Sequence, residues 1–222
     1  MRALVIQHGE DGPGGHVTDW LAAHDALLDV FRIDVDHGER DPGDYDLIVS
    51  LGSERAAYDD TLSWVPRELR ILAAAADADV PVLGICFGSQ LLARALGAEA
   101  MRAEKVEIGW VPIRALEPSL VGEGPWLQWH YDTFSLPAGA KLLAESPAGP
   151  QAYTAGRSLG VQFHPEVTAE IVANWISQDG AALRRQGLDP VRLLAETRER
   201  DAENRARAVR LMDVFVDQVA GL

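Results

Sequence analysis

The sequence predicts an α/β fold in which helices cover both faces of a mostly parallel sheet, with an antiparallel extension. In the first half of the chain, short β-branched runs alternate with segments of helical periodicity, which is typical of parallel strand–helix–strand units. In the second half, short strand-like segments are separated by Pro and Gly, which is typical of antiparallel pairing. The 222 residues contain no internal repeat or low-complexity linker, so a single domain over residues 1–222 is expected.

Strands and helices follow one another in order along the first half. Strands are expected at the apolar residues 3–7, 30–35, 46–50 and 80–85. Helices are expected where apolar residues recur at helical spacing, over residues 17–28, 62–76 and 89–96. Gly97 directly follows the last of these helices and marks its end. The alternation predicts strands that run parallel to one another.

The second half is expected to begin with strands and to end with helices. Strands are predicted at residues 108–113, 141–144 and 159–163, and a helix at residues 168–176. Asp189 is a good N-cap and Pro190 suits the first helical position, so a last helix is expected over about residues 189–219. Oppositely charged side chains recur four residues apart along it, which indicates a surface helix.

Charge and cysteine content exclude several classes of protein. The chain has 20 Lys+Arg against 34 Asp+Glu, a net charge of −14, which makes nucleic acid and anionic membranes poor partners. No apolar run is long enough for a signal peptide or a membrane span. The single cysteine excludes an internal disulfide framework. These observations predict a cytoplasmic protein, and the excess of Arg over Lys indicates a GC-rich bacterial genome.

The single cysteine lies in a motif that is typical of a nucleophile. An apolar strand runs into Gly84-x-Cys86-x-Gly88 and then directly into a helix, which is the nucleophile-elbow pattern with Cys in place of Ser. The turn aims Sγ at the start of the helix, where backbone N–H dipoles favour a thiolate. The N–H of Phe87 is expected to face a developing oxyanion. The alternative is a packed core cysteine after a buried strand.

A base and its orienting group follow the strand at residues 159–163. Strand alternation places Val161 and Phe163 on the core face, and His164 on the opposite face. Glu166 lies two residues beyond His164 and can accept a hydrogen bond from the imidazole. The sequence therefore predicts Cys86, His164 and Glu166 as a nucleophile, a base and an orienting carboxylate.

At these residues the chain resembles the stand-alone class I (triad) glutamine amidotransferases. The nucleophile motif of that family, Gly-x-Cys-x-Gly-x-Gln, is matched by Gly84, Cys86, Gly88 and Gln90. The second family motif, Gly-x-Gln-Phe-His-Pro-Glu, is matched by Gly160, Gln162, Phe163, His164, Pro165 and Glu166. The resemblance implies a flavodoxin-like three-layer fold, a γ-glutamyl thioester on Cys86, and ammonia as the first product.

The same resemblance implies further site residues. Gly52 follows the strand that leads to the oxyanion loop of the family, and its backbone joins that of Phe87 in the oxyanion hole. Gln90, with Trp129, His130 and Tyr131, is implied in binding the substrate glutamine. Gln90 can also be interpreted as an ordinary residue of the first helical turn, and His130 as a pocket wall without a chemical role.

The oxyanion loop departs from the family pattern. It commonly reads Gly-Gly-Pro-x-Ser, whereas this chain has Leu51-Gly52-Ser53-Glu54-Arg55. The difference is compatible with a shifted oxyanion hole, with a different γ-glutamyl substrate, or with weak activity that awaits a partner. Near the amino terminus, His8, His16 and His24 show no metal-ligand pattern, so surface or packing roles are expected for them.

The sequence thus predicts an enzyme that hydrolyses the γ-amide of L-glutamine to glutamate and ammonia, without a metal or an organic cofactor. The alternatives are a γ-glutamyl peptidase or hydrolase with the same three residues, and a weakly active regulatory subunit. No residues remain for a fused synthetase within this stretch, so any use of the ammonia requires a separate acceptor subunit.

Overall fold

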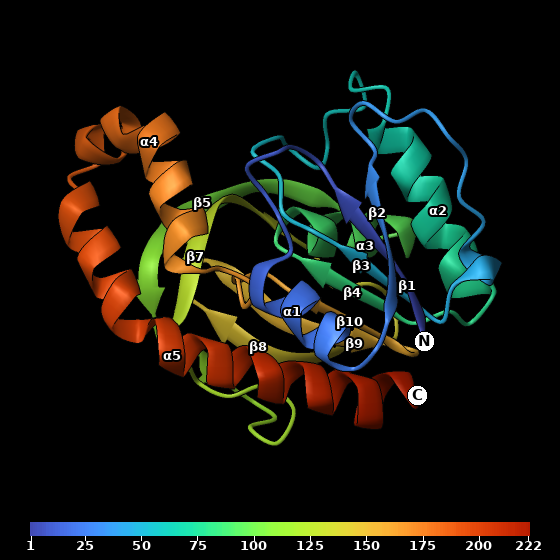
Figure 1. The fold of residues 1–222 in the computed structure, drawn as a ribbon. Coiled ribbons are helices and arrows are strands. Elements are labelled where there is room, and N and C mark those ends of the chain that lie inside the picture. Colours follow the sequence, from blue (N-terminus) through green and yellow to red (C-terminus); the bar gives the residue numbers. More distant parts are fainter.

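A mixed sheet runs through the middle of the structure, a computed structural model that describes residues 1–222 (Figure 1). Its strands are β1 (Arg2–Gln7), β2 (Leu27–Arg32), β3 (Leu47–Ser50), β4 (Val82–Ile85), β6 (Arg114–Ala115), β8 (Lys141–Ser146), β9 (Gly149–Ala155) and β10 (Ser158–Val161). Their order is β2-β1-β3-β4-β10-β9-β8-β6. Neighbours from β2 to β10 pair in parallel, and β9, β8 and β6 continue the sheet in antiparallel fashion. The predicted parallel sheet with an antiparallel extension is confirmed.

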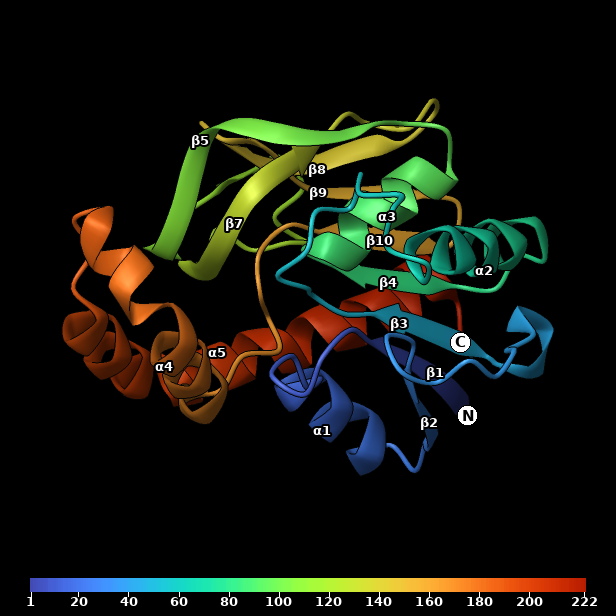
Figure 2. The same cartoon turned by 90° about the horizontal axis from the view of Figure 1, so that it is seen from above.

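A second, two-stranded sheet stands apart from the central one. It consists of β5 (Ala100–Val111) and β7 (Trp126–Phe134), which pair in antiparallel fashion with an irregularity between Arg102 and Glu107. In Figures 1 and 2 this ribbon lies at the same end of the molecule as α4 (Ala169–Arg185). Polar residues interrupt the apolar pattern of β7 and β9, so neither strand is predicted from the sequence.

Helices cover both faces of the central sheet (Figure 1). Besides α4 they are α1 (Gly15–Ala23), α2 (Val65–Asp77), α3 (Phe87–Ala95), α5 (Pro190–Val214), the short 3₁₀ helix η1 (Pro42–Asp44) and the π-helical turn η2 (Phe215–Ala220). Along β1, Ala3 and Val5 pack into the core beneath α1 and η2, whereas Leu4 and Ile6 pack into the core beneath α2 and α3. This alternation produces three layers. None of the helices combines the length and apolarity that crossing a bilayer requires.

The segment between α1 and β2 differs from the prediction. The helix expected over residues 17–28 ends at Ala23, and β2 begins at Leu27, so the prediction is wrong for residues 24–28. Asp25 takes a left-handed conformation with φ 54°, and the Ala26 N–H donates back to the Leu21 carbonyl, which terminates the helix. Leu27 is 73% exposed and lies on the edge strand β2. Its apolar side chain continues the helical spacing in the sequence, but it is not part of a buried helix face.

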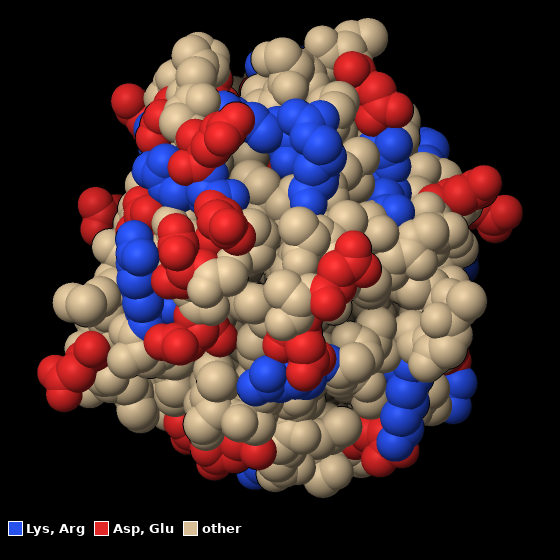
Figure 3. Space-filling model, turned by 90° about the vertical axis from the view of Figure 1, so that its right-hand side faces the viewer, with Lys and Arg blue, Asp and Glu red and all other residues tan.

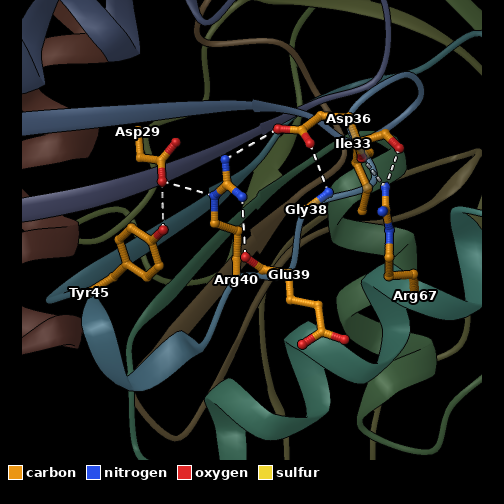
Figure 4. A network of polar contacts seen from close by, with 8 residues as sticks. All are labelled: Asp29, Ile33, Asp36, Gly38, Glu39, Arg40, Tyr45 and Arg67. Carbon is orange, nitrogen blue, oxygen red and sulfur yellow. Dashed lines mark hydrogen bonds and ion pairs between the residues drawn. The ribbon is translucent and has the colours of Figure 1, made fainter.

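The long connection between β2 and β3 is fixed by a polar cluster (Figure 4). The Asp29 carboxylate accepts from Arg40 Nε at 2.9 Å and from the Tyr45 hydroxyl at 2.6 Å. Burial and the adjacent Asp29 raise the pKa of Tyr45 to about 12. Arg67 on α2 donates to the carbonyls of Ile33 and Asp36. Figure 3 shows the face on this side of the molecule, where acidic and basic side chains are interspersed.

Candidate active site

A cleft of about 670 Å³ opens where the parallel strands end. It is bounded by the segments that follow β1, β3, β4 and β10, by the ribbon of β5 and β7, and by α4. Ligands of open α/β sheets commonly bind at this edge. The lining includes every residue that the sequence analysis singled out for the site: Gly52, Cys86, Phe87, Gln90, Trp129, His130, Tyr131, His164 and Glu166.

Cys86 occupies a strained turn between β4 and α3. Its φ of 51° and ψ of −108° are unusual for a residue other than glycine, and such strain concentrates at functional sites. A Cβ on Gly84 would lie 2.7 Å from the Gly88 carbonyl oxygen, and one on Gly88 would overlap the Ser50 carbonyl. The backbone approaches so closely here that both positions require glycine. The turn leaves Cys86 at the base of the cleft, 5% exposed.

The side chains of His164 and Glu166 form a buried pair beside Cys86. His164 Nδ1 and Glu166 Oε1 are 2.6 Å apart, and each residue is only 3% exposed. Nε2 of His164 has no hydrogen-bond partner in the protein. Burial lowers the pKa of His164, but the negative charges of Glu166 and Cys86 outweigh burial and raise it to about 10. The imidazole is therefore held in its protonated form, and it can pass a proton through Nε2.

A chain of amides connects the elbow with Gln90. The amide nitrogen of Gln162 lies 3.5 Å from Cys86 Sγ, and its oxygen accepts from the amide nitrogen of Gln90 at 3.1 Å. Gln162 is completely buried, and Gln90 is nearly so. Gln162 belongs to the second family motif, but the sequence alone assigns it no role. Its contact with sulfur orients the thiol side chain, because the amide nitrogen is a donor and a thiolate is an acceptor.

Gly52 lies against both Cys86 and His164. A Cβ on Gly52 would lie 3.0 Å from His164 Cε1 and 3.9 Å from Cys86 Cβ, so a larger residue would press on the histidine. The backbone N–H groups of Gly52 and Ser53 donate no hydrogen bond within the chain. Phe87 is the first residue of α3, so its N–H has no partner within the helix. These N–H groups are therefore available to donate hydrogen bonds to an oxyanion that forms beside Cys86.

Trp129, His130 and Tyr131 form part of β7 on the far wall of the cleft. His130 is 3% exposed; its Nδ1 donates to the Asp132 carbonyl at 3.0 Å, and its Nε2 lies 3.4 Å from Glu107 Oε2. The Tyr131 hydroxyl accepts from Gln186 at 2.8 Å. His130 is thus held by its neighbours on the ribbon, with its ring at the edge of the cleft.

Trp175 on α4 closes the wall beside the His–Glu pair. Its ring meets that of His164 edge-on, with centroids 5.0 Å apart. Its indole N–H donates to the Asp11 carbonyl at 2.7 Å, which ties α4 to the segment after β1. The helix expected over residues 168–176 continues in the structure to Arg185. This longer helix brings Gln178 and Asp179 to the rim of the cleft.

His8 is the main residue whose place in the site the sequence did not reveal. Its ring is buried and packs against Phe87 and Trp64, as a packing role implies, and it is also hydrogen-bonded to Glu68 Oε2 at 2.6 Å and to the Gly52 carbonyl at 3.1 Å. His16 is buried with no hydrogen-bond partner for its ring, and burial lowers its pKa. The side chain of His24 stacks on Trp20 outside the cleft. No cluster of His, Cys, Asp and Glu side chains has the arrangement of a metal site.

Comparisons with known proteins point to one family. A family model described as "Glutamine amidotransferase class-I" matches residues 17–178. A glutamine amidotransferase structure from Thermotoga maritima is 29% identical with a TM-score of 0.89, and covers 98% of this chain and 99% of its own. The glutamine amidotransferase of Methylobacillus flagellatus gives the same identity and TM-score, over 98% and 95% of the two chains.

Curated relatives are longer proteins. GMP synthase [glutamine-hydrolyzing] of Aeropyrum pernix is 38% identical over 132 residues, which are 53% of this chain and 26% of that protein. The corresponding enzyme of Thiobacillus denitrificans is 36% identical over 138 residues, which are 54% and 25% of the two chains. The aligned part of this chain thus spans about a quarter of the length of these relatives.

Proposed function

Because the chain belongs to the class-I glutamine amidotransferase family, we propose that it hydrolyses the γ-amide of L-glutamine to glutamate and ammonia, with Cys86 as the nucleophile. The observation that carries this proposal is the strained Cys86 elbow beside the buried His164–Glu166 pair, in one cleft at the carboxyl ends of the strands. Each group has the chemical character that its role requires.

The first half of the reaction forms a thioester. The Cys86 thiolate attacks the γ-carbonyl carbon, and the carbonyl oxygen becomes an oxyanion that accepts from the N–H groups around Gly52 and Phe87. Protonated His164 then gives its Nε2 proton to the amide nitrogen, the C–N bond breaks, and ammonia leaves. Glu166 stabilises the imidazolium before this transfer and fixes the orientation of the ring throughout.

The second half returns the enzyme to its starting state. His164, now neutral, takes a proton from a water molecule, and the resulting hydroxide attacks the thioester carbon. The C–S bond breaks, glutamate leaves, and Cys86 is a thiolate again beside a protonated His164. Gln90, Trp129, His130 and Tyr131 bind the glutamine in this proposal, with Gln90 acting together with Gln162.

A separate synthetase subunit that receives the ammonia is part of the proposal. Support comes from the GMP synthases, which are named as glutamine-hydrolysing and of which this chain matches only about a quarter. A tagged chain purified from its own cells is expected to retain such a subunit. If the chain is repeatedly recovered without a synthetase, under mild and cross-linking conditions alike, the partner hypothesis is wrong.

A γ-glutamyl peptidase or hydrolase is the second candidate, and the size of the cleft favours it. The cavity of about 670 Å³ extends past the Cys86 region to Arg32, Asp34 and Arg102, where a leaving amine larger than ammonia can be accommodated. The chemistry at the carbonyl carbon is the same for both substrates. The two functions therefore differ only in what the outer cleft accepts.

Glutamate release by the purified chain separates these candidates. L-Glutamine and a panel of γ-glutamyl peptides are compared, with Cys86→Ala as the blank and Cys86→Ser as a second nucleophile variant. Preferred turnover of glutamine is the expected result, and preference for the peptides would replace the amidotransferase with a peptidase. Absence of turnover on all substrates would favour a regulatory subunit. If Cys86→Ala retains wild-type activity, the assignment of the nucleophile is wrong.

A further inference from the structure

A second buried histidine–glutamate pair lies behind the oxyanion loop, and the reaction described above does not use it. We infer that His8, held by Glu68, is a positioning residue that fixes the Gly52–Ser53 peptide for oxyanion stabilisation. This inference rests on the proposed function, because it concerns the same nucleophile and the same loop. Its basis is the hydrogen bonding and burial of the pair.

Both ring nitrogens of His8 are hydrogen-bonded. Nδ1 lies 3.1 Å from the Gly52 carbonyl oxygen, and Nε2 lies 2.6 Å from Glu68 Oε2. The other oxygen of Glu68 accepts from the Ser50 hydroxyl at 2.6 Å. Glu68 and Ser50 are completely buried, and the His8 side chain is only 1% exposed. The cluster connects the end of β1, the end of β3 and the first turn of α2.

The hydrogen-bond partners determine where the protons lie. A carbonyl oxygen can only accept, so Nδ1 of His8 must carry a proton and donate it to Gly52. A second proton lies between Nε2 and Glu68, since these atoms are 2.6 Å apart. Ser50 then donates to the remaining carboxyl oxygen. Glu68 therefore fixes the ring orientation that directs the Nδ1 proton to the loop.

The hydrogen bond from His8 Nδ1 to the Gly52 carbonyl restrains the whole Gly52–Ser53 peptide group. A trans peptide is planar, with its carbonyl and its N–H pointing in opposite directions, so fixing the Gly52 carbonyl also fixes the Ser53 N–H. Gly52 and Ser53 donate no backbone hydrogen bond of their own. The preceding residue is anchored differently, because the Leu51 N–H donates to Ile6 and the Leu51 carbonyl accepts from Gly88, both at 3.1 Å. His8 thus supplies the restraint on the carboxyl side of the loop.

His8 also contacts the other half of the oxyanion hole. Its ring packs edge-on against Phe87, with centroids 4.8 Å apart, and lies 5.1 Å from the ring of Trp64. The loop here has Ser53 at the position where the related pattern has proline, so the backbone itself supplies less rigidity. The buried ring replaces that rigidity from outside the loop.

The test uses two reagents that report on the single cysteine. p-Nitrophenyl acetate acylates Cys86 through a tetrahedral oxyanion, whereas iodoacetamide alkylates it without forming one. His8→Gln keeps a donor within reach of Glu68 and loses the Nδ1 donor to Gly52. His8→Asn places an amide nitrogen near the position of Nδ1 and keeps that donor. His24→Gln, outside the cleft, is the matched control.

If His8 is a positioning residue, its replacement is expected to slow acylation of Cys86 but not alkylation. His8→Gln is expected to slow acylation by about 10-fold or more, as weakened oxyanion stabilisation does, while alkylation stays within about 2-fold. His8→Asn and His24→Gln are expected to keep acylation within about 3-fold of the wild-type rate. With glutamine as substrate, His8→Gln is expected to lower kcat and to leave KM nearly unchanged.

Other outcomes would overturn the inference. Equal losses of acylation and alkylation would indicate a structural effect on Cys86 instead, and unchanged acylation would show that His8 does not position the loop. If His8→Gln does not fold, the double variant His8→Phe/Glu68→Leu removes the same bond and leaves no unpaired buried charge. Should the wild type not turn over glutamine, the proposed function fails, but acylation by the ester still tests His8 separately.

Discussion

The pairs His164–Glu166 and His8–Glu68 both lie against Gly52, and each joins a ring nitrogen to a carboxylate oxygen at 2.6 Å. They differ in the second ring nitrogen. That of His164 has no partner in the protein, whereas that of His8 is bonded to the Gly52 carbonyl. A free nitrogen can transfer a proton, and a bonded one holds a backbone group in place. The two proposed roles, proton transfer for His164 and positioning for His8, therefore follow from the partner of the second ring nitrogen and not from the His–Glu contact, which both pairs share.

Replacement of His164 is expected to have the largest effect. His164→Gln removes the proton donor and acceptor, and glutamine turnover should fall by roughly 10²- to 10⁴-fold. Alkylation of Cys86 by iodoacetamide should also slow, because the imidazolium that stabilises the thiolate is lost. His8→Gln is expected to leave alkylation nearly unchanged, so the two pairs are separated by one assay. Equal alkylation rates in the two variants would contradict the comparison.

Breaking the second pair is expected to affect stability strongly. Glu68→Leu leaves the Nε2 position of a buried histidine unpaired, and it should lower the free energy of unfolding by about 3 kcal/mol or more. The double variant His8→Phe/Glu68→Leu should recover most of this loss, since apolar side chains then fill the site. Urea denaturation of the single and double variants measures both values. A double variant as unstable as Glu68→Leu would show that the unpaired histidine is not the cause.

The contribution of the His164–Glu166 pair to stability is expected to depend on pH. The pKa of His164 is raised to about 10, so its charged form stabilises the fold fully below the ordinary histidine pKa of about 6.5. That contribution is lost as the pH rises from about 6.5 through 10. Glu166→Gln removes a negative charge that raises this pKa, so the stability difference from wild type should be largest near pH 6 and smallest near pH 10. Thermal unfolding across this range measures the difference, with Glu203→Gln at an exposed position of α5 as the control. A difference that grows with pH would contradict the assignment.

A methyl group on Gly52 tests the contact between the loop and the reacting pair. Gly52→Ala places a Cβ 3.0 Å from His164 Cε1, so the histidine must shift by a few tenths of an ångström. Displacement of a reacting group on this scale is expected to lower kcat by about 10-fold without unfolding the protein. Gly122→Ala is the matched control, because a Cβ there meets no atom within 4 Å. Equal activity in both variants would show that the close packing does not matter.

The smallest expected effect on stability comes from a substitution in the polar cluster between β2 and β3. Arg40→Gln removes the bond from Arg40 Nε to Asp29 and should lower the free energy of unfolding by about 1 kcal/mol. Turnover should not change, because the cluster touches neither histidine pair. A loss of activity at unchanged stability would link this region to the cleft and would weaken the distinction drawn above.

Site residues whose partners lie nearby in the sequence could be predicted from the sequence alone. The Cys86 elbow lies within a few residues of the strand and helix that shape it, and Glu166 is two residues from His164. The parallel strands β1, β3 and β4 were also predictable, because their apolar runs are buried on both faces. His8 and Glu68 are separated by 60 residues, and no local pattern relates them. Their pairing depends on how α2 packs against the end of β1, which is a property of the tertiary fold.

The same distinction explains the errors in secondary structure. Residues 27 and 28 carry the spacing of a helix, but a left-handed Asp25 and pairing with β1 place them in a strand. The strand β7 contains the buried polar residues Gln128 and His130, and Gln128 donates to Gln151 on β9 at 2.8 Å. Polar residues that are satisfied by distant partners cannot be recognised as buried from sequence alone.

The contacts of Arg157 bear on where the chain can be circularly permuted or fused to another protein. Its side chain donates to the Ala220 carbonyl at 2.6 Å and to the Asp79 carbonyl at 2.9 Å, which holds the end of η2 beside the amino ends of β10 and β4. The amino end of β1 lies at this same edge, and Figures 1 and 2 show the two termini close together. The cleft lies at the opposite edge. A circular permutant that joins the termini through a short flexible linker, or a fluorescent protein fused to either one, therefore leaves the entrance of the cleft open.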